Sequence, residues 1–199
     1  MTDGRALRWA GHREQRRSDF VAAALDVISR TGPSATVDQI AGELGVTRQA
    51  LYRQFDDRAD LDAAIAVAAA DQLVAAVLPH LDLARGIEVS VRSGLLAYVV
   101  YVEQHLPLYR FVQAHEASGA VARARDSLRS EVAAVARAHL VAAGGAGVAL
   151  AEVFATGVVG MADAVVGRWL DEPAGLTRDQ IVDQLVEMVL GVMDRVISP

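Results

Sequence analysis

The chain has 199 residues, a formal net charge of −6 and no cysteine. The absence of cysteine excludes a disulfide scaffold, a cysteine-bound zinc or iron–sulfur centre and a thiol nucleophile. A hydrophobic fraction of 53% against 22% charged residues predicts a folded chain and excludes disorder for most of its length. An acidic total argues against a surface that is basic throughout, but it is compatible with a local basic site.

The charge is unevenly distributed along the chain. Residues 1–58 carry 9 Arg and 8 acidic residues, a net charge of +1, whereas residues 59–199 carry −7. Residues 1–17 hold five arginines against two acidic residues, and we expect them to form a flexible basic arm. Such an arm is either a solvated tail or a segment that contacts DNA phosphates or the minor groove.

Helix-forming residues and apolar residues at helical spacing predict an all-α fold. Ser18 is a candidate N-cap for the first helix, in which Phe20, Ala24 and Ile28 recur at helical spacing. The Gly-Pro pair at residues 32–33 ends this helix.

A helix-turn-helix motif is predicted between residues 36 and 55. Thr36 and Gln39 have the spacing of a capping box at the start of the second helix. Gly45 stands where a helix ends in the left-handed conformation, and Thr47 then caps a short third helix at 48–55. Two short helices joined by a tight turn with glycine are typical of a DNA-binding helix-turn-helix.

The third helix presents a polar face. Its outward residues are Arg48, Gln49, Tyr52 and Arg53. Arginine can bind guanine and glutamine can bind adenine in the major groove, while tyrosine and the hydroxyl of Thr47 suit phosphate oxygens. Taken alone, this face is equally typical of a solvated amphipathic helix; the preceding helix, the turn and the basic arm together favour DNA.

Residues 20–65 resemble the DNA-binding domain of TetR-type transcriptional regulators. The resemblance is carried by residues 36–41 (Thr-Val-Asp-Gln-Ile-Ala), 44–47 (Leu-Gly-Val-Thr) and 51–55 (Leu-Tyr-Arg-Gln-Phe), followed by Arg58 and Leu61. Gln54 and Arg58 depart from the His and Lys that many members carry, so base preference does not transfer. The resemblance implies that DNA is contacted by Thr36, Thr47, Arg48, Gln49, Tyr52, Arg53, Gln54 and Arg58, with Thr36 and Arg58 at helix N-termini holding the DNA backbone.

Six further helices are expected, at 60–78, 86–104, 107–115, 120–143, 147–170 and 177–197. The glycine-rich residues 144–147 predict a loop, because no strand precedes them as a nucleotide-binding loop requires. The expected organisation is the arm at 1–17, a helix-turn-helix DNA-binding domain at 18–62 and a helical effector-binding and dimerisation domain at 63–199.

The last two expected helices are the most apolar. Gly157, Gly160 and Ala164 lie along one side of the first, and an apolar stripe runs from Leu185 to Val196 in the second. Both faces could be buried within one subunit. The resemblance instead implies a homodimer in which these two helices of each subunit form a four-helix bundle, and two-fold symmetry suits a palindromic operator.

The resemblance also implies a pocket for a small-molecule effector in the C-terminal helices. The candidate lining residues are Tyr98, Tyr101, His105, Phe111, Asp163 and Trp169. Each aromatic side chain is equally compatible with plain core packing, and Asp163 either anchors a ligand or pairs with an arginine across the dimer. A cavity on the order of a few hundred Å³ would support the effector hypothesis.

The predicted function is therefore a dimeric transcriptional regulator, a repressor that a largely apolar effector releases from its operator. The alternatives are a helical carrier or sensor with vestigial DNA binding and a constitutive repressor without an effector. No catalytic motif or metal-binding pair of histidines occurs, so we expect no enzyme, metal or cofactor. The longest apolar run, 153–166, is too short for a membrane span and no export signal is visible, which predicts a cytoplasmic protein with no membrane partner.

Overall fold

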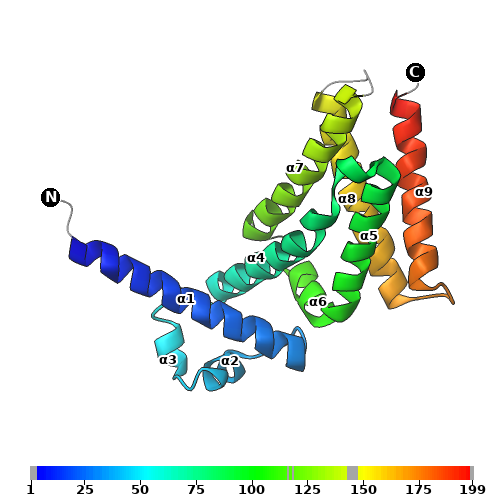
Figure 1. Cartoon of the computed structure of the whole chain (residues 1–199). Coiled ribbons are helices and arrows are strands. Elements are labelled where there is room, and N and C mark those ends of the chain that lie inside the picture. Colours follow the sequence, from blue (N-terminus) through cyan, green and yellow to red (C-terminus); the bar gives the residue numbers. More distant parts are fainter. Residues whose placement is uncertain (1–3, 116, 118, 143–147, 198–199) are drawn as a thin grey trace. The chain divides into compact units, whose positions relative to one another are not determined.

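The structure is a computed structural model that describes residues 4–115, 117, 119–142 and 148–197 (Figure 1). Over these residues the chain forms nine α-helices and two short 3-10 helices, and no strand. The predicted all-α fold is confirmed. The predicted glycine-rich loop at 144–147 and the side chains of residues 1–13 lie outside what the structure describes.

The helices follow the predicted order closely. They are α1 (Gly4–Thr31), α2 (Val37–Glu43), α3 (Arg48–Leu51), α4 (Arg58–Val77), η1 (Leu78–His80), η2 (Leu83–Arg85), α5 (Ile87–Gln104), α6 (Leu106–Ala114), α7 (Gly119–Ala142), α8 (Val148–Asp171) and α9 (Arg178–Ile197). From α5 onward each boundary agrees with the prediction to one residue. Pro79 ends α4 as expected, and the chain tightens into the 3-10 turn η1.

The chain divides into two compact units. The first comprises residues 1–71 and 105–123, and the second comprises residues 72–104 and 124–199. Helix α4 contributes residues to both units, and α6 packs against α1 within the first. The predicted domain boundary after residue 62 falls inside α4 and separates α6 from the helices with which it packs.

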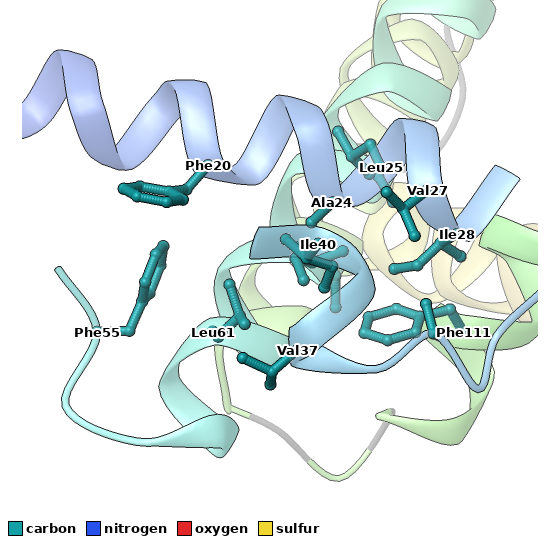
Figure 2. Close-up of a cluster of buried hydrophobic side chains, with 14 of the residues drawn as sticks. Phe20, Ala24, Leu25, Val27, Ile28, Val37, Ile40, Phe55, Leu61 and Phe111 are labelled. Carbon is teal, nitrogen blue, oxygen red and sulfur yellow. The ribbon is translucent and has the colours of Figure 1, made fainter. Parts of the chain in front are cut away.

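The first unit is built around one hydrophobic core, whose side chains come from α1, α2, α3, α4, α6 and the start of α7 (Figure 2). Phe20 and Phe55 meet edge to face with their ring centroids 6.3 Å apart. Phe111 of α6 is fully buried in the same cluster as Ile28 and Val37. Burying one such side chain stabilises the folded state by about 1.5–3 kcal/mol. The helix-turn-helix segment therefore depends on α6 for a complete core.

In the second unit, α5 packs against α9 and η1. Val99 of α5 and Leu185 of α9 are fully buried. A Cβ atom placed on Gly94 would lie 2.5 Å from Cδ2 of Leu81, so a larger residue there would require the Leu81 side chain to move.

Helix α1 starts well before its predicted N-cap. It begins at Gly4, so residues 4–17 are helical, and Ser18 lies within the helix as an exposed residue. Gln15 donates a hydrogen bond to Asp19 across Ser18, and Arg17 is held by tertiary contacts. These contacts override the local capping preference of serine, so the predicted helix start is wrong.

Arg17 connects α1 to the chain that follows α3. Its Nη1 donates to the carbonyl oxygen of Gln54 at 2.7 Å, and its Nη2 donates to Oδ1 of Asp60 at 2.7 Å. Its guanidinium carbon lies 4.2 Å from the ring centroid of Phe55. The hydrogen bond from Arg17 holds the pKa of the Asp60 carboxyl below its ordinary value, and the same bond raises the pKa of Arg17. One side chain thus fixes the turn between α3 and α4 against α1.

We predict that Arg17→Met lowers the free energy of unfolding by about 1 kcal/mol at neutral pH, because it removes a half-exposed ion pair and a cation–π contact. The lowered folded-state pKa of Asp60 stabilises the fold above the ordinary value of 3.8, and this contribution is lost as the pH falls through the folded pKa. Chemical denaturation should therefore show a smaller difference in the free energy of unfolding between the unaltered protein and Arg17→Met at about pH 3 than at neutral pH. Arg16→Met, at an exposed position one residue away, is the control. If the destabilisation caused by Arg17→Met is the same at both pH values, the ion pair with Asp60 does not contribute to stability.

Candidate nucleic-acid interface

The helix-turn-helix is fixed by local hydrogen bonds at both of its helix starts. Gln39 donates its backbone N–H to Oγ1 of Thr36 at 3.3 Å, and Thr36 donates its own N–H to Oε1 of Gln39 at 2.7 Å. Gly45 has φ +63°, a left-handed conformation that glycine adopts without steric cost. Ala50 then donates its N–H to Oγ1 of Thr47 at 3.2 Å. The predicted capping box, turn glycine and second cap are confirmed.

Helix α3 is shorter than predicted. It ends at Leu51, and the backbone N–H of Gln54 then donates to the carbonyl oxygen of Leu51 at 2.8 Å, which closes a tight turn. The carbonyl oxygen of Gln54 accepts its hydrogen bond from Arg17 instead of from a further helical turn. The prediction that this helix continues to residue 55 is therefore wrong, although Phe55 is buried in the core.

The start of α3 carries an exposed polar face. Arg48, Gln49 and Arg53 are exposed, and Tyr52 is half-buried. The guanidinium carbon of Arg48 lies 5.6 Å from the ring centroid of Tyr52, and its Nη1 lies 3.7 Å from Oδ2 of Asp38 in α2. Because 59% of the Arg48 side chain remains exposed, its guanidinium is available to a partner in solution.

The residues predicted to hold the DNA backbone have structural partners as well. Thr36 and Thr47 are exposed, and their hydroxyl oxygens accept the capping hydrogen bonds already described. Gln54 is half-buried beside Arg17. The exposed starts of α2 and α3 leave room for phosphate contacts. A DNA contact stays a prediction for Thr36, Thr47 and Gln54.

Arg58 ties the start of α4 to the start of α2. Its Nε donates to both carboxylate oxygens of Asp62, at 2.7 and 2.8 Å, and its Nη2 donates to the carbonyl oxygen of Ala35 at 3.1 Å. Asp62 is buried, and Nε2 of His115 lies 3.5 Å from its Oδ2. His115 follows α6, so a buried carboxylate joins α4, the residue before Thr36 and the end of α6.

A cavity of about 130 Å³ lies in the second unit. Aliphatic side chains and Phe154 form most of its wall. Two of the predicted effector-site residues, Tyr98 and Asp163, line it, and the Tyr98 hydroxyl donates to Oδ1 of Asp163 at 3.1 Å. The cavity is smaller than the few hundred Å³ that the effector hypothesis leads us to expect.

The other four predicted pocket residues lie elsewhere. Phe111 is in the core of the first unit, and His105 is the N-cap residue of α6. The Tyr101 hydroxyl donates to Oε1 of Gln72 at 3.3 Å, and burial raises the pKa of this tyrosine. Trp169 donates its Nε1–H to the carbonyl oxygen of Leu176 at 2.9 Å. None of these four is among the residues described as lining the cavity.

The cavity wall contains one polar residue that was not predicted from the sequence. Ser90 lines the cavity and is 1% exposed, and its Oγ has no hydrogen-bond partner within the described part of the chain. Leaving a buried hydroxyl unpaired costs about 1–3 kcal/mol. The sequence places Ser90 at helical spacing from Ile87 and Gly94, but it does not show that the hydroxyl lacks a partner.

Residues 20–65 match the family model described as bacterial regulatory proteins of the tetR family. The chain therefore contains a DNA-binding domain of the tetR type at these residues. A helix-turn-helix transcriptional regulator of Mycobacterium tuberculosis is 29% identical over 191 residues, covering 92% of this chain and 80% of that relative. The transcriptional activator FasR of Mycolicibacterium smegmatis is 24% identical over 187 residues, covering 92% of this chain and 85% of FasR. The crystal structure of a TetR-family regulator from Streptomyces coelicolor superposes with a TM-score of 0.73 at 22% identity, covering 92% and 87% of the two chains.

The matched domain and the curated relatives indicate the broad function. The chain is a DNA-binding transcriptional regulator and not an enzyme. Two of its described helices, Arg58–His80 and Ala149–Asp171, are long and apolar enough to cross a membrane, but core helices of soluble proteins have the same character. The TetR-type fold accounts for both as parts of folded helical units.

We predict that Arg58→Ala has two effects. The free energy of unfolding falls by about 2 kcal/mol, because the buried Asp62 loses its charged hydrogen-bond donor. Affinity falls by a similar factor for every DNA sequence, and the salt dependence weakens by about one phosphate contact. Thermal unfolding and operator titrations at several salt concentrations measure the two effects. If the variant is destabilised but the salt dependence of its operator affinity is unchanged, Arg58 has a structural role only and does not contact a phosphate.

Proposed function

We propose that this TetR-family chain is a dimeric repressor that binds a palindromic operator and is released by a small, largely apolar effector. The proposal is carried by the exposed Arg48 and Gln49 at the start of α3, in a helix-turn-helix whose apolar side is fully packed. Because operator DNA lies in the cytoplasm, we place the protein there. FasR is named as an activator, so a reporter gene fused to the operator tests the direction of regulation.

Sequence recognition would fall to the two residues with the most suitable chemistry. The guanidinium of Arg48 can make two hydrogen bonds to guanine, and the amide of Gln49 can make two to adenine. Their exposure supports access to the base edges in the major groove. The intact face argues against a carrier with vestigial DNA binding, since such a protein has no use for these exposed side chains.

Dimerisation would cover an apolar surface on α8 and α9. Val153 of α8 is 69% exposed and Val192 of α9 is 52% exposed. Gly157 and Gly160 have open space where a Cβ would stand, so no other part of the described chain packs on them. A second copy can bury the same face on both subunits in a two-fold interface, and small residues allow helices to approach closely.

Effector release is supported by the apolar cavity with its Tyr98–Asp163 pair. The small volume of this cavity is the observation that favours the second candidate function, a constitutive repressor. An apolar cavity of about 150 Å³ can nevertheless hold a molecule of the size of benzene, so the volume is compatible with a small effector.

Arg48→Ala and Gln49→Ala are expected to relax sequence preference by about 5- to 150-fold at one base pair each, because each removes a two-bond contact with a base. Selection of bound duplexes from a randomised pool, followed by affinity measurements on the selected sites, provides the test. Arg85→Ala, which removes an exposed arginine outside the helix-turn-helix, should change neither preference nor affinity. An equal loss on every DNA sequence for Arg48→Ala would overturn its role in reading bases.

Val192→Glu should convert the dimer into a monomer and weaken operator binding, because a carboxylate would be buried in the proposed interface. Sedimentation velocity reports the oligomeric state, and fluorescence anisotropy with a labelled operator reports the affinity. Val89→Glu makes the same change at an exposed position of α5 and should leave the dimer intact. A monomeric unaltered protein would contradict the proposed interface.

A further inference from the structure

We infer that the cavity of the second unit binds an uncharged single-ring molecule with a hydroxyl group, such as a phenol, and rejects the corresponding carboxylate. This inference rests on the proposed effector function and specifies the chemical class that would act through it. Three features of the cavity support it: its size, an unpaired buried hydroxyl and the charge of its wall.

The size and wall of the cavity fit one ring. Its volume is about 130 Å³, close to the roughly 150 Å³ of an apolar cavity that holds benzene. Val91, Leu95 and Val158 supply aliphatic surface, and Phe154 supplies an aromatic wall. These apolar side chains make no hydrogen bonds, so a flat apolar molecule of this size can pack against them without breaking any.

Ser90 provides a hydrogen-bonding group without a partner. Its backbone N–H is used, since it donates to the carbonyl oxygen of Gly86 at 3.0 Å. Its Oγ makes no hydrogen bond within the described residues, although the residue is 1% exposed and lines the cavity. Buried polar groups are almost always satisfied by a protein group, an ordered water or a ligand. A serine hydroxyl both donates and accepts, so it suits the hydroxyl of a neutral ligand.

The charge of the wall disfavours an acid. The carboxylate of Asp163 lines the cavity and accepts the hydrogen bond from Tyr98. No Arg, Lys or His occurs among the lining residues that the structure describes. An anionic ligand would therefore be desolvated near a carboxylate, and the described lining residues supply no cation to offset that cost. A ligand hydroxyl avoids this cost and can also donate to a carboxylate.

Three matched probes test the inference on the full-length protein: 4-methylphenol, toluene and 4-methylbenzoate, titrated by calorimetry at neutral pH. They share one ring and one methyl group and differ in the polar group. We expect 4-methylphenol to bind about fivefold more tightly than toluene, the gain of one hydrogen bond. We expect 4-methylbenzoate to bind at least about tenfold more weakly than 4-methylphenol.

Two variants separate ligand binding from a structural role. Ser90→Ala should lower the affinity for 4-methylphenol about fivefold and leave toluene unchanged. It should not lower the melting temperature, because Oγ has no protein hydrogen bond to lose among the described residues. Ser93→Ala, on the same helix but outside the cavity lining, should change neither affinity.

The inference is overturned if 4-methylbenzoate binds as tightly as 4-methylphenol, if no probe binds, or if Ser90→Ala leaves the affinity for 4-methylphenol unchanged. Operator titrations with and without each probe keep the proposed function separate. Release of the operator by 4-methylbenzoate alone would retain the effector function and reject the phenol class. Binding of 4-methylphenol in the expected order without any change in operator affinity would retain the ligand class and reject effector release.

Discussion

The DNA-binding unit depends on one hydrophobic contact that its own segment of sequence does not supply. Phe111 of α6 is fully buried among side chains of α1 and α2, including Ile28 and Val37 (Figure 2). Removing a buried phenylalanine typically costs 3–5 kcal/mol, a large part of the stability of a small unit. The position of α6 is therefore part of the helix-turn-helix fold. Helix α5, which lines the cavity, precedes α6 directly in the chain.

A buried polar network accompanies this apolar contact. Asp62 binds Arg58, which holds the carbonyl oxygen of Ala35, and His115 approaches the same carboxylate from the end of α6. A ligand can change operator affinity only through unequal affinity for two states of the protein. The chain passes between the two units three times, within α4, at the α5–α6 connection and within α7. Residues of this network lie on α4 and directly after α6.

Features set by neighbouring residues were predictable from the sequence, and features set by distant residues were not. The capping box of Thr36 and Gln39 and the left-handed Gly45 involve residues within a few positions of each other. The end of α3 was missed because the chain that follows it is held by Arg17, which contacts residues 37 and 43 positions away. Phe111 was a candidate for the effector pocket or for core packing, and the sequence could not show that it belongs to the core of the first unit.

The same distinction explains why the lining of the cavity differs from the predicted effector pocket. Aromatic residues dominated the predicted pocket, whereas the structure lines the cavity with aliphatic side chains and brings in only Tyr98 and Asp163 of the predicted set. Ser90 was missed because one hydroxyl on an apolar helix face is unremarkable until its lack of a partner is known. Satisfaction of a buried polar group is a three-dimensional property, and periodicity carries no information about it.

Arg48, on the exposed face of α3, has two possible partners whose interaction energies can be compared. Arg48 lies between Asp38 and Tyr52, and both it and Asp38 are largely exposed. An exposed ion pair contributes about 0.2–1 kcal/mol, whereas a two-bond contact with the correct base discriminates by about 1–3 kcal/mol. If Arg48 reads a guanine as proposed, the base can therefore displace Asp38 from it. On the proposed role of Arg48, this exposed ion pair would cost little operator affinity, and an overall charge of −6 is compatible with local recognition of DNA.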